Sequence, residues 1–288
     1  MCSHVVPPET TIQSLIKNES DFLGFKNFTL HADLTTPVGA FEADERIFVK
    51  CGETRENFAF SALCSRLQEE MGMQFVKTEL LDLTYDSQYW RGKVEGSKNQ
   101  KWSEKVTQRM RGIAKADVAV LPAMMTAFYP GVRVTDLHNM RDRSLSEAIM
   151  KRPNFAKDLV EIHLFAAYIG IKDAQGFNML VSVSEKDHER ELGSILLVDM
   201  NRADAVNMEK SNRRGMAQKM HAKFRERMRR YILREYKQIA VFMRTLKERA
   251  PRHELYDSIL FDESSIDQIE RGETKKLEQA MFVPKLTV

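Results

Sequence analysis

The chain has 288 residues, of which 43% are hydrophobic and 30% are charged, and its formal net charge is +3. This composition suits a globular protein with a sizeable core, excludes a disordered chain, and does not by itself call for a nucleic-acid partner. The three cysteines, Cys2, Cys51 and Cys64, lack metal-ligand spacing and predict free thiols in a reducing compartment. No run of about 18 apolar residues and no signal peptide is present, so we expect a cytoplasmic protein without a membrane span.

The first part of the chain predicts a small β-rich lobe. Residues 25–50 form short strand patterns, and the last one ends in "RIFVK" at Lys50. Residues 56–71 then change to helical spacing, and Gly72 supplies a helix stop. The run "QFVKTELLDL" returns to a strand pattern, so the order is β-β-β-α-β.

The middle and the end of the chain predict a mostly helical lobe. The polar, glycine-containing segment 87–105 predicts a loop or an insertion, and a strand follows it up to Met125. Helical spacing runs from Ser144 to Ile169 with a break near Pro153, and returns from Ala203 to Arg249. The resulting α+β chain divides into an N-terminal extension (1–24), a β lobe (25–125) and a helical lobe (126–288).

Between these helical stretches lies a predicted hairpin with oxygen-bearing side chains at one end. Asn178 opens the apolar strand "FNMLVSV", and Asp199 closes the strand "SILLVD". The two ends of an antiparallel pair lie side by side, so these two residues are expected to meet. Asp173 stands in the loop just before the first strand. Oxygen ligands with few carboxylates are what Mg²⁺ prefers, so the spacing predicts a magnesium site.

These residues resemble the atypical protein kinases, a group that includes the phosphatidylinositol kinases, the actin-fragmin kinase and the toxin-type serine kinases of bacteria. The resemblance lies in the D-x-x-x-x-N of Asp173 and Asn178 and in "LLVD", which ends in Asp199. It implies a bilobal kinase-like fold, ATP and Mg²⁺ as cofactors, and a protein Ser or Thr as acceptor. Asn178 and Asp199 would bind the metal, and Asp173 would position or deprotonate the acceptor hydroxyl.

The same resemblance assigns residues in the β lobe. Lys50 at the end of a strand would grip the ATP phosphates, and Glu56 at the start of the following helix would pair with it. Glu53 is a rival partner in the connecting loop. "LPAMMTAFYPGVRVTDL" resembles the hinge, where an adenine would meet backbone around Met124 and Met125.

The pattern departs from ordinary kinases in two places. A Gly-rich loop is missing, because only Gly39 stands between the first two predicted strands, and Asp199 is followed by Met-Asn rather than Phe-Gly. A pseudokinase or an AMP-transferring protein would keep several of the same residues. Each residue also has a simpler interpretation: turn or cap for Asp173 and Asn178, solvated strand end for Lys50, first-turn helix residue for Glu56.

The basic helices over residues 210–249 allow a second class of function. Met216, Met220, Phe224, Met228, Tyr231 and Ile232 repeat at helical spacing and predict a core-facing side. The Arg and Lys residues then cover the other side, either as a solvated face partly paired with glutamates or as a docking surface for an acidic partner, a phosphoinositide head group or nucleic acid. A non-enzymatic binding module that uses this surface is the alternative to a kinase.

Overall fold

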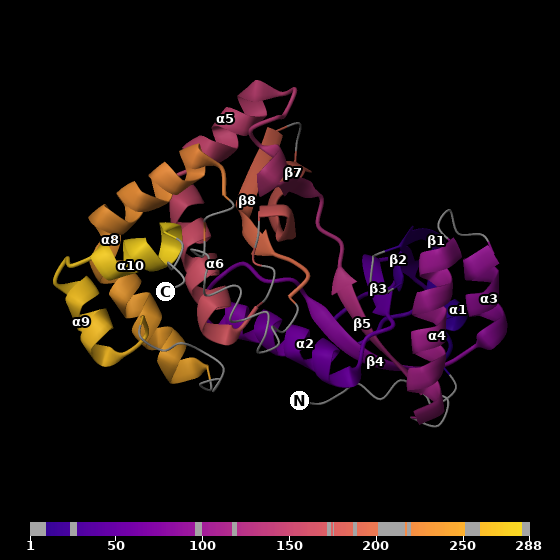
Figure 1. Cartoon of the computed structure of the whole chain (residues 1–288). Coiled ribbons are helices and arrows are strands. Elements are labelled where there is room, and N and C mark those ends of the chain that lie inside the picture. Colours follow the sequence, from indigo (N-terminus) through magenta and orange to yellow (C-terminus); the bar gives the residue numbers. More distant parts are fainter. Residues whose placement is uncertain are drawn as a thin grey trace. The chain divides into compact units, whose positions relative to one another are not determined.

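The computed structural model describes residues 10–23, 28–95, 100–116, 120–171, 174, 176–186, 189–200, 217, 220–250 and 260–283. The chain divides into two compact units (Figure 1). The first unit comprises residues 1–65 and 76–129, and the second comprises residues 66–75 and 130–288. The fold is α+β, with an antiparallel sheet in the first unit and a mainly helical second unit, as predicted. No described helix is long and apolar enough to cross a membrane.

The first unit contains a five-stranded sheet in the order β1-β2-β3-β5-β4, and every neighbouring pair is antiparallel. Its strands are β1 (Ile16–Leu23), β2 (Phe28–Leu34), β3 (Arg46–Cys51), β4 (Thr78–Thr84) and β5 (Val120–Ala127). Helix α2 (Arg55–Glu70) begins within one residue of the predicted start at Glu56. It ends before Gly72, whose φ of 68° provides the left-handed stop that the sequence predicted.

The expected N-terminal extension contributes structure to this unit. A short helix, α1 (Ile12–Leu15), leads into β1, which pairs with β2 from Ile16↔Leu34 to Leu23↔Phe28. The sequence pattern did not predict β1, because the strand "IKNESDFL" lies at the sheet edge and carries mostly polar residues. The boundary expected between residues 125 and 126 also differs from the structure, since it falls inside β5.

The segment 87–105, expected as a loop, is helical over most of its length, so that prediction is wrong. It forms α3 (Ser87–Glu95) and the start of α4 (Gln100–Ala116), which are neighbouring helices (Figure 1). The segment is helical because a small number of apolar residues give α3 and α4 a side that is buried. Trp90 is 1% exposed and its ring lies 5.2 Å from that of Phe28, while Val106 and Met110 are buried one helical turn apart.

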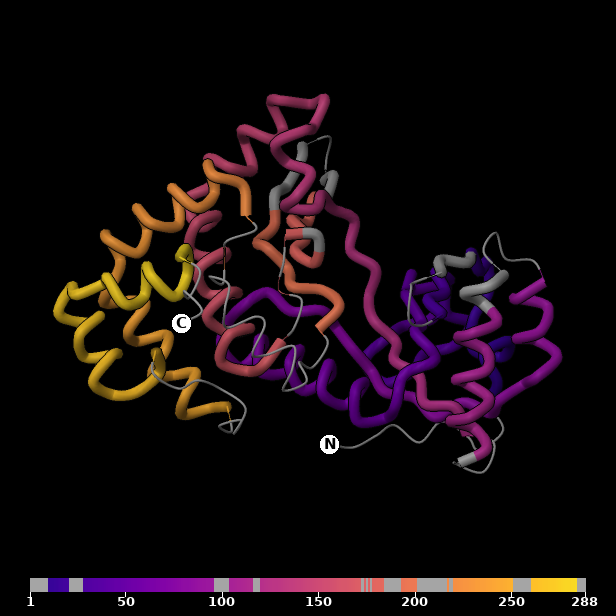
Figure 2. The backbone as a smooth tube through the Cα atoms, in the orientation of Figure 1, coloured from indigo at the N-terminus to yellow at the C-terminus, as the bar shows by residue number. Residues whose placement is uncertain are grey.

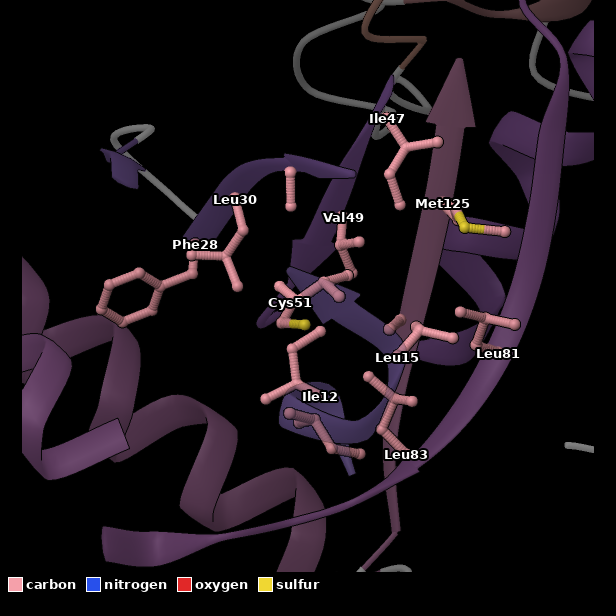
Figure 3. Close-up of a cluster of buried hydrophobic side chains, with 14 of the residues drawn as sticks. Ile12, Leu15, Phe28, Leu30, Ile47, Val49, Cys51, Leu81, Leu83 and Met125 are labelled. Carbon is pink, nitrogen blue, oxygen red and sulfur yellow. The ribbon is translucent and has the colours of Figure 1, made fainter. Parts of the chain in front are cut away.

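One face of the five-stranded sheet carries the hydrophobic core of the first unit. Alternate residues of β3 point into it, and Figure 3 shows Val49 and Met125 among the side chains gathered there. Residues of α1, α3 and α4 also contribute to this cluster. The intervening residues of β3, Phe48 and Lys50, therefore lie on the opposite face of the sheet.

The second unit combines a small sheet with a group of helices. The strands β6 (Gly131–Arg133), β7 (Met179–Lys186) and β8 (Glu189–Leu197) form an antiparallel sheet in that order. The helices are α5 (Arg143–Lys151), α6 (Phe155–Ile169), α8 (Ala222–Arg249), α9 (Glu263–Glu270) and α10 (Lys275–Phe282), with 3-10 turns η1 (Val134–Asp136) and η2 (Gly176–Asn178). The predicted break near Pro153 is confirmed by the gap between α5 and α6.

Helices α6 and α8 form the centre of the second unit and run side by side (Figure 2). The predicted apolar face of α8 is confirmed, since Met220 before the helix and a row of residues within it are buried: Phe224, Met228, Tyr231 and Ile232. The predicted helix start at Ala203 and the residue Met216 lie outside the described residues.

Candidate functional site

Strands β7 and β8 bring two of the predicted metal-binding residues to the same end of a hairpin. Met179 pairs with Leu197, and the N–H of Val198 donates to the carbonyl oxygen of Asn178 at 2.8 Å. Asp199 follows Val198 directly. The predicted pairing of these strands is confirmed, and it places the two residues next to each other at the point where the hairpin ends.

The two residues differ in their surroundings. Asn178 ends η2 and is only 7% exposed, whereas Asp199 is exposed. Asp199 has a φ of 59°, in the left-handed region that few residues other than glycine adopt. Asp tolerates this region better than most residues, and such conformations gather at functional sites because the surrounding structure must hold them. The chain after β8 therefore holds the Asp199 backbone in this left-handed conformation.

Asp173 lies outside the described residues, so its predicted role stays a prediction. Helix α6 ends shortly before Asp173 in the chain. Gly170, with a φ of 93°, caps this helix, and its N–H donates to the carbonyl oxygen of Ala166 at 3.1 Å. Asp173 therefore belongs to the connection between α6 and η2, five residues before Asn178.

The donor set of this hairpin end fits Mg²⁺ rather than a transition metal. An amide oxygen from Asn178 and a carboxylate from Asp199 are hard oxygen ligands. Protein sites for Mg²⁺ commonly supply one or two carboxylates and leave the remaining positions to water and substrate phosphates. Within the described residues, no cluster of three or more His, Cys, Asp or Glu side chains offers a site made by the protein alone. The arrangement thus suits a metal ion that arrives with a phosphate ligand.

In the first unit, the predicted phosphate-gripping residue lies in the middle of the sheet. Lys50 is half-buried on β3 and stands directly opposite Thr29 on β2 and Met124 on β5. Directly opposed residues of an antiparallel pair share a face, so Lys50 and Met124 lie on the same face of the sheet, away from the hydrophobic core. The sheet therefore fixes the position of the Lys50 backbone and the face from which its side chain extends.

The structure places the predicted hinge residues inside a strand, which differs from the expectation. Met124 and Met125 are buried in β5, which is paired with β3 on one side and β4 on the other. These ladders use the backbone groups of the strand, so an adenine finds no open backbone there. Met125 lies opposite Val49 and belongs to the core (Figure 3). The first unit ends at Tyr129, two residues after β5.

The two glutamates expected near Lys50 have different partners. Glu56 is exposed, and its own backbone N–H, helped by the Thr54 hydroxyl, holds the pKa of its carboxyl below the usual range. Glu53 is more enclosed: Asn57 donates to its carboxylate at 3.2 Å, and Arg109 lies 3.6 Å from it. Glu56 therefore keeps its negative charge at an exposed helix start, where it remains open to a further cation.

The sequence pattern misplaced the connection between the first two strands of the sheet. The first two strands of the sheet are β1 and β2, joined by residues 24–27 ("GFKN"), which lie outside the described residues. The sequence had placed this connection near Gly39, between what are now β2 and β3. Phe28 pairs with Cys51, so β2 starts at the Lys50 end of β3. Gly24, which stands between apolar residues in the stretch 22–25, was the sequence signal that could have indicated this connection.

Comparisons with known proteins identify a weak similarity only. No protein-family model and no curated protein sequence matches the chain. Among solved structures, the chain is similar to one described as the Helicobacter pylori proinflammatory kinase CtkA, with 13% identity and a TM-score of 0.38. The similarity spans 94% of this chain and 96% of that one. At this TM-score it does not place the chain in a family.

Proposed function

We propose that the protein is an ATP- and Mg²⁺-dependent phosphotransferase of the protein kinase-like type, with a Ser or Thr hydroxyl of another protein as acceptor. The observation that carries this proposal is the end of the β7–β8 hairpin, where Asn178 and Asp199 are adjacent. Asp173 precedes this pair in the chain at the spacing that phosphotransfer sites use.

The residues of the second unit divide the work of the transfer. Asn178 and Asp199 would hold Mg²⁺, which would neutralise charge on the phosphates. Asp173 orients the acceptor hydroxyl and takes its proton as the hydroxyl oxygen bonds to the γ-phosphorus. The bond between that phosphorus and the bridging oxygen breaks, and ADP leaves. Positioning and charge neutralisation account for most of the rate of such a step, so few protein groups are needed.

The residues of the first unit bind the nucleotide. Lys50 contacts the α- and β-phosphates, and Glu56 pairs with Lys50 when the nucleotide is bound. Met124 shares the face of Lys50 and contacts the adenine through its side chain. The backbone contacts to the adenine come from Tyr129, because it follows the end of β5, whereas the N–H of Phe128 still donates to the carbonyl oxygen of Arg46 on β3 at 3.1 Å.

The test combines nucleotide binding with the fate of a label. ATP at about 100 times its Kd stabilises a protein by about 2.7 kcal/mol, so thermal unfolding should shift upward with ATP and Mg²⁺ and should shift less with ATP and a chelator. Incubation of the protein with a cell lysate and γ-labelled ATP should label an acceptor protein in the lysate. The same incubation with α-labelled ATP should not label it. Labelling by the α-label alone would indicate AMP transfer. No stabilisation by ATP and Mg²⁺ would contradict the proposal.

A further inference from the structure

The second unit contains an arginine-lined cavity that the proposed phosphotransfer does not use. Its volume is about 240 Å³, and it lies between the turn that joins α5 to α6 and the first half of α8. Four of its lining residues are arginines: Arg152, Arg227, Arg230 and Arg234. Pro153, Ala156 and Tyr231 complete the lining.

Two of the arginines are held in place by other parts of the unit. Arg152 pairs with Asp158 at 3.0 Å, and both side chains are 13% exposed. Asp158 in turn accepts the N–H of Ile195 on β8 at 3.1 Å. Arg227 donates to the carbonyl oxygen of Met150, a neutral acceptor. A guanidinium group has five N–H donors, so the bond to Met150 fixes the direction of the Arg227 side chain and leaves donors of that side chain for a ligand.

The other two arginines are exposed and loosely paired. Arg230 lies 3.0 Å from Glu226 with 77% of its side chain exposed, and Arg234 lies 2.7 Å from Glu235 with 73% exposed. Exposed ion pairs of this kind contribute little free energy, about 0–1 kcal/mol. These two side chains can therefore exchange their carboxylates for a bound anion at small cost.

The N-terminus of α6 lies at the same cavity, and the N–H of Phe155 there donates to the carbonyl oxygen of Arg152 at 3.2 Å. This helix has 15 residues, and Asn154 at its N-cap makes no side-chain capping hydrogen bond. The first backbone N–H groups of a helix have no partner within it, and they carry the positive end of the helix dipole. Ala156, in the first turn of α6, lines the cavity. Arginine side chains and a helix start thus converge on one place.

The second half of α8 differs from the first in its charge balance. Arg244 pairs with Asp267 and Glu270 of α9 at 2.6 and 2.8 Å, and Lys247 pairs with Glu263. Acidic side chains of a neighbouring helix therefore pair with these two cations of that half. Arg227, in contrast, has only a neutral oxygen as its acceptor among the described residues. Among the described residues, Arg227 is therefore the cavity arginine without a carboxylate partner, while Arg230 and Arg234 have theirs only in exposed pairs.

We propose that this cavity binds a phosphate monoester group, namely a phosphorylated Ser or Thr side chain of a peptide. Arginine forks bind phosphate oxygens in pairs, and arginine clusters are a common means of phosphopeptide recognition. The volume is below the roughly 300–1,000 Å³ of pockets for drug-sized ligands, which suits a single phosphorylated side chain better than a nucleotide. This site is separate from the hairpin end and does not depend on phosphotransfer.

The alternatives from the sequence suit the cavity less well. Single-stranded nucleic acid binds through aromatic rings on which bases stack. The one aromatic residue of the lining, Tyr231, is 6% exposed, so its ring offers no such surface. Anionic membranes are bound by several cations on an open surface. Arg152 is mostly enclosed beside Asp158, so the cavity is not an open cationic surface. It therefore suits one compact anionic group better than a membrane.

The test measures binding of a fluorescent peptide with one phosphoserine in a Gly/Ser context, in the absence of nucleotide. We expect Arg227→Gln and the double variant Arg230→Gln/Arg234→Gln each to weaken binding at least tenfold. Lys237→Gln is the matched control, because Lys237 is an exposed cation of the same helix that does not line the cavity. It should change the affinity less than twofold. Asp199→Ala should leave peptide binding unchanged, which separates this site from the proposed phosphotransfer site.

Four further probes identify the anion. The unphosphorylated peptide should bind at least tenfold more weakly, and inorganic phosphate should compete only at much higher concentration. Equal affinity for inorganic phosphate and the phosphopeptide would assign the cavity to the free ion and overturn the proposal. Equal weakening by Lys237→Gln would show a general charge effect. Tighter binding of single-stranded RNA or of vesicles with phosphoinositide, lost in the same arginine variants, would also overturn it. The double variant changes exposed residues, so loss of folding does not obscure the result.

Discussion

The backbone N–H of Val198 donates to the carbonyl oxygen of Asn178 at 2.8 Å, and this contact places Asp199 beside Asn178 at the end of the β7–β8 hairpin. Both residues are proposed to bind the same metal ion. The most direct prediction therefore concerns metal-dependent nucleotide binding.

We expect Asp199→Ala to abolish the stabilisation of the protein by ATP and Mg²⁺, because the site then loses its carboxylate ligand. Thermal unfolding with and without Mg²⁺ measures this. The matched control is Asp44→Ala, since Asp44 also has a positive φ, of 65°, but lies in the first unit and pairs with Lys17. Both substitutions place alanine at a positive φ. An unchanged response to ATP and Mg²⁺ in both variants would remove the metal site from the hairpin end.

A different result is expected for Asp173→Ala. This residue is proposed to act on the acceptor hydroxyl and not on the metal, so binding of ATP and Mg²⁺ should persist while turnover falls at least a hundredfold, the range of general base catalysis. Isothermal titration of ATP and the rate of acceptor labelling separate the two effects. Loss of nucleotide binding in this variant would assign Asp173 to the metal instead.

The phosphate grip is tested by Lys50→Ala. Lys50 stands in the middle of the sheet, and its removal should lower ATP affinity about tenfold or more, with the protein still folded by circular dichroism. Lys17→Ala is the control, because Lys17 is an exposed lysine of the same sheet. Full activity of Lys50→Ala would move the phosphate contact elsewhere.

The partner of Lys50 is identified by a pair of glutamate variants. Glu56→Gln should lower ATP affinity, because Glu56 is the glutamate that stays charged at the helix start. Glu53→Gln should instead lower stability, because the Glu53 carboxylate holds Asn57 and Arg109. If Glu53→Gln lowers ATP affinity and Glu56→Gln does not, Glu53 is the partner.

The pH dependence of stability should reveal the buried carboxyl of Glu161. Burial raises its pKa to about 7, against 4.5 in the unfolded chain. The native state therefore binds more protons between pH 4.5 and 7, and this contribution to stability is present below pH 4.5 and is lost as the pH rises to 7. Glu161→Gln should be more stable than the parent by about 1–3 kcal/mol at pH 8 and nearly equal to it at pH 4.5.

His163 acts in the opposite direction on the same helix. Burial lowers its pKa to about 4, so the stability associated with its neutral ring is lost as the pH falls from 6.5 to 4. His163 is present in both the parent and Glu161→Gln, so its effect cancels in the difference between their free energies of unfolding. Urea unfolding of both proteins at each pH measures that difference. A stability difference that does not change between pH 4.5 and 8 would contradict the assignment to Glu161.

Packing of the small sheet is tested at Gly131. A Cβ at this position would lie 2.3 Å from the carbonyl oxygen of Val181, a backbone atom that cannot rotate away. Gly131→Ala should lower the free energy of unfolding by about 1–3 kcal/mol. Gly112→Ala on α4 should instead raise it by about 0.5–1 kcal/mol, because a Cβ there meets no atom within 4 Å and alanine favours the helix. Equal effects of the two substitutions would contradict the close approach at Gly131.

The sequence by itself determined the elements whose apolar pattern was strong. Apolar strand patterns bounded by polar residues were enough to predict the β7–β8 hairpin. Helical spacing of apolar residues was enough to predict α2 and the buried face of α8. It also predicted that Asn178 and Asp199 stand at the same end of the hairpin, because the ends of an antiparallel pair lie together by geometry.

Only the tertiary structure decided the elements and sites that depend on contacts distant in sequence. The strand β1 carries little apolar pattern and is defined by its pairing with β2, and α3 depends on the packing of Trp90 against Phe28. The arginine cavity is a further case. Arg152 and Arg227 stand far apart in the chain, and no periodicity relates them. They line one cavity because α6 and α8 pack together, and that packing is decided by apolar surface rather than by the charges it brings together.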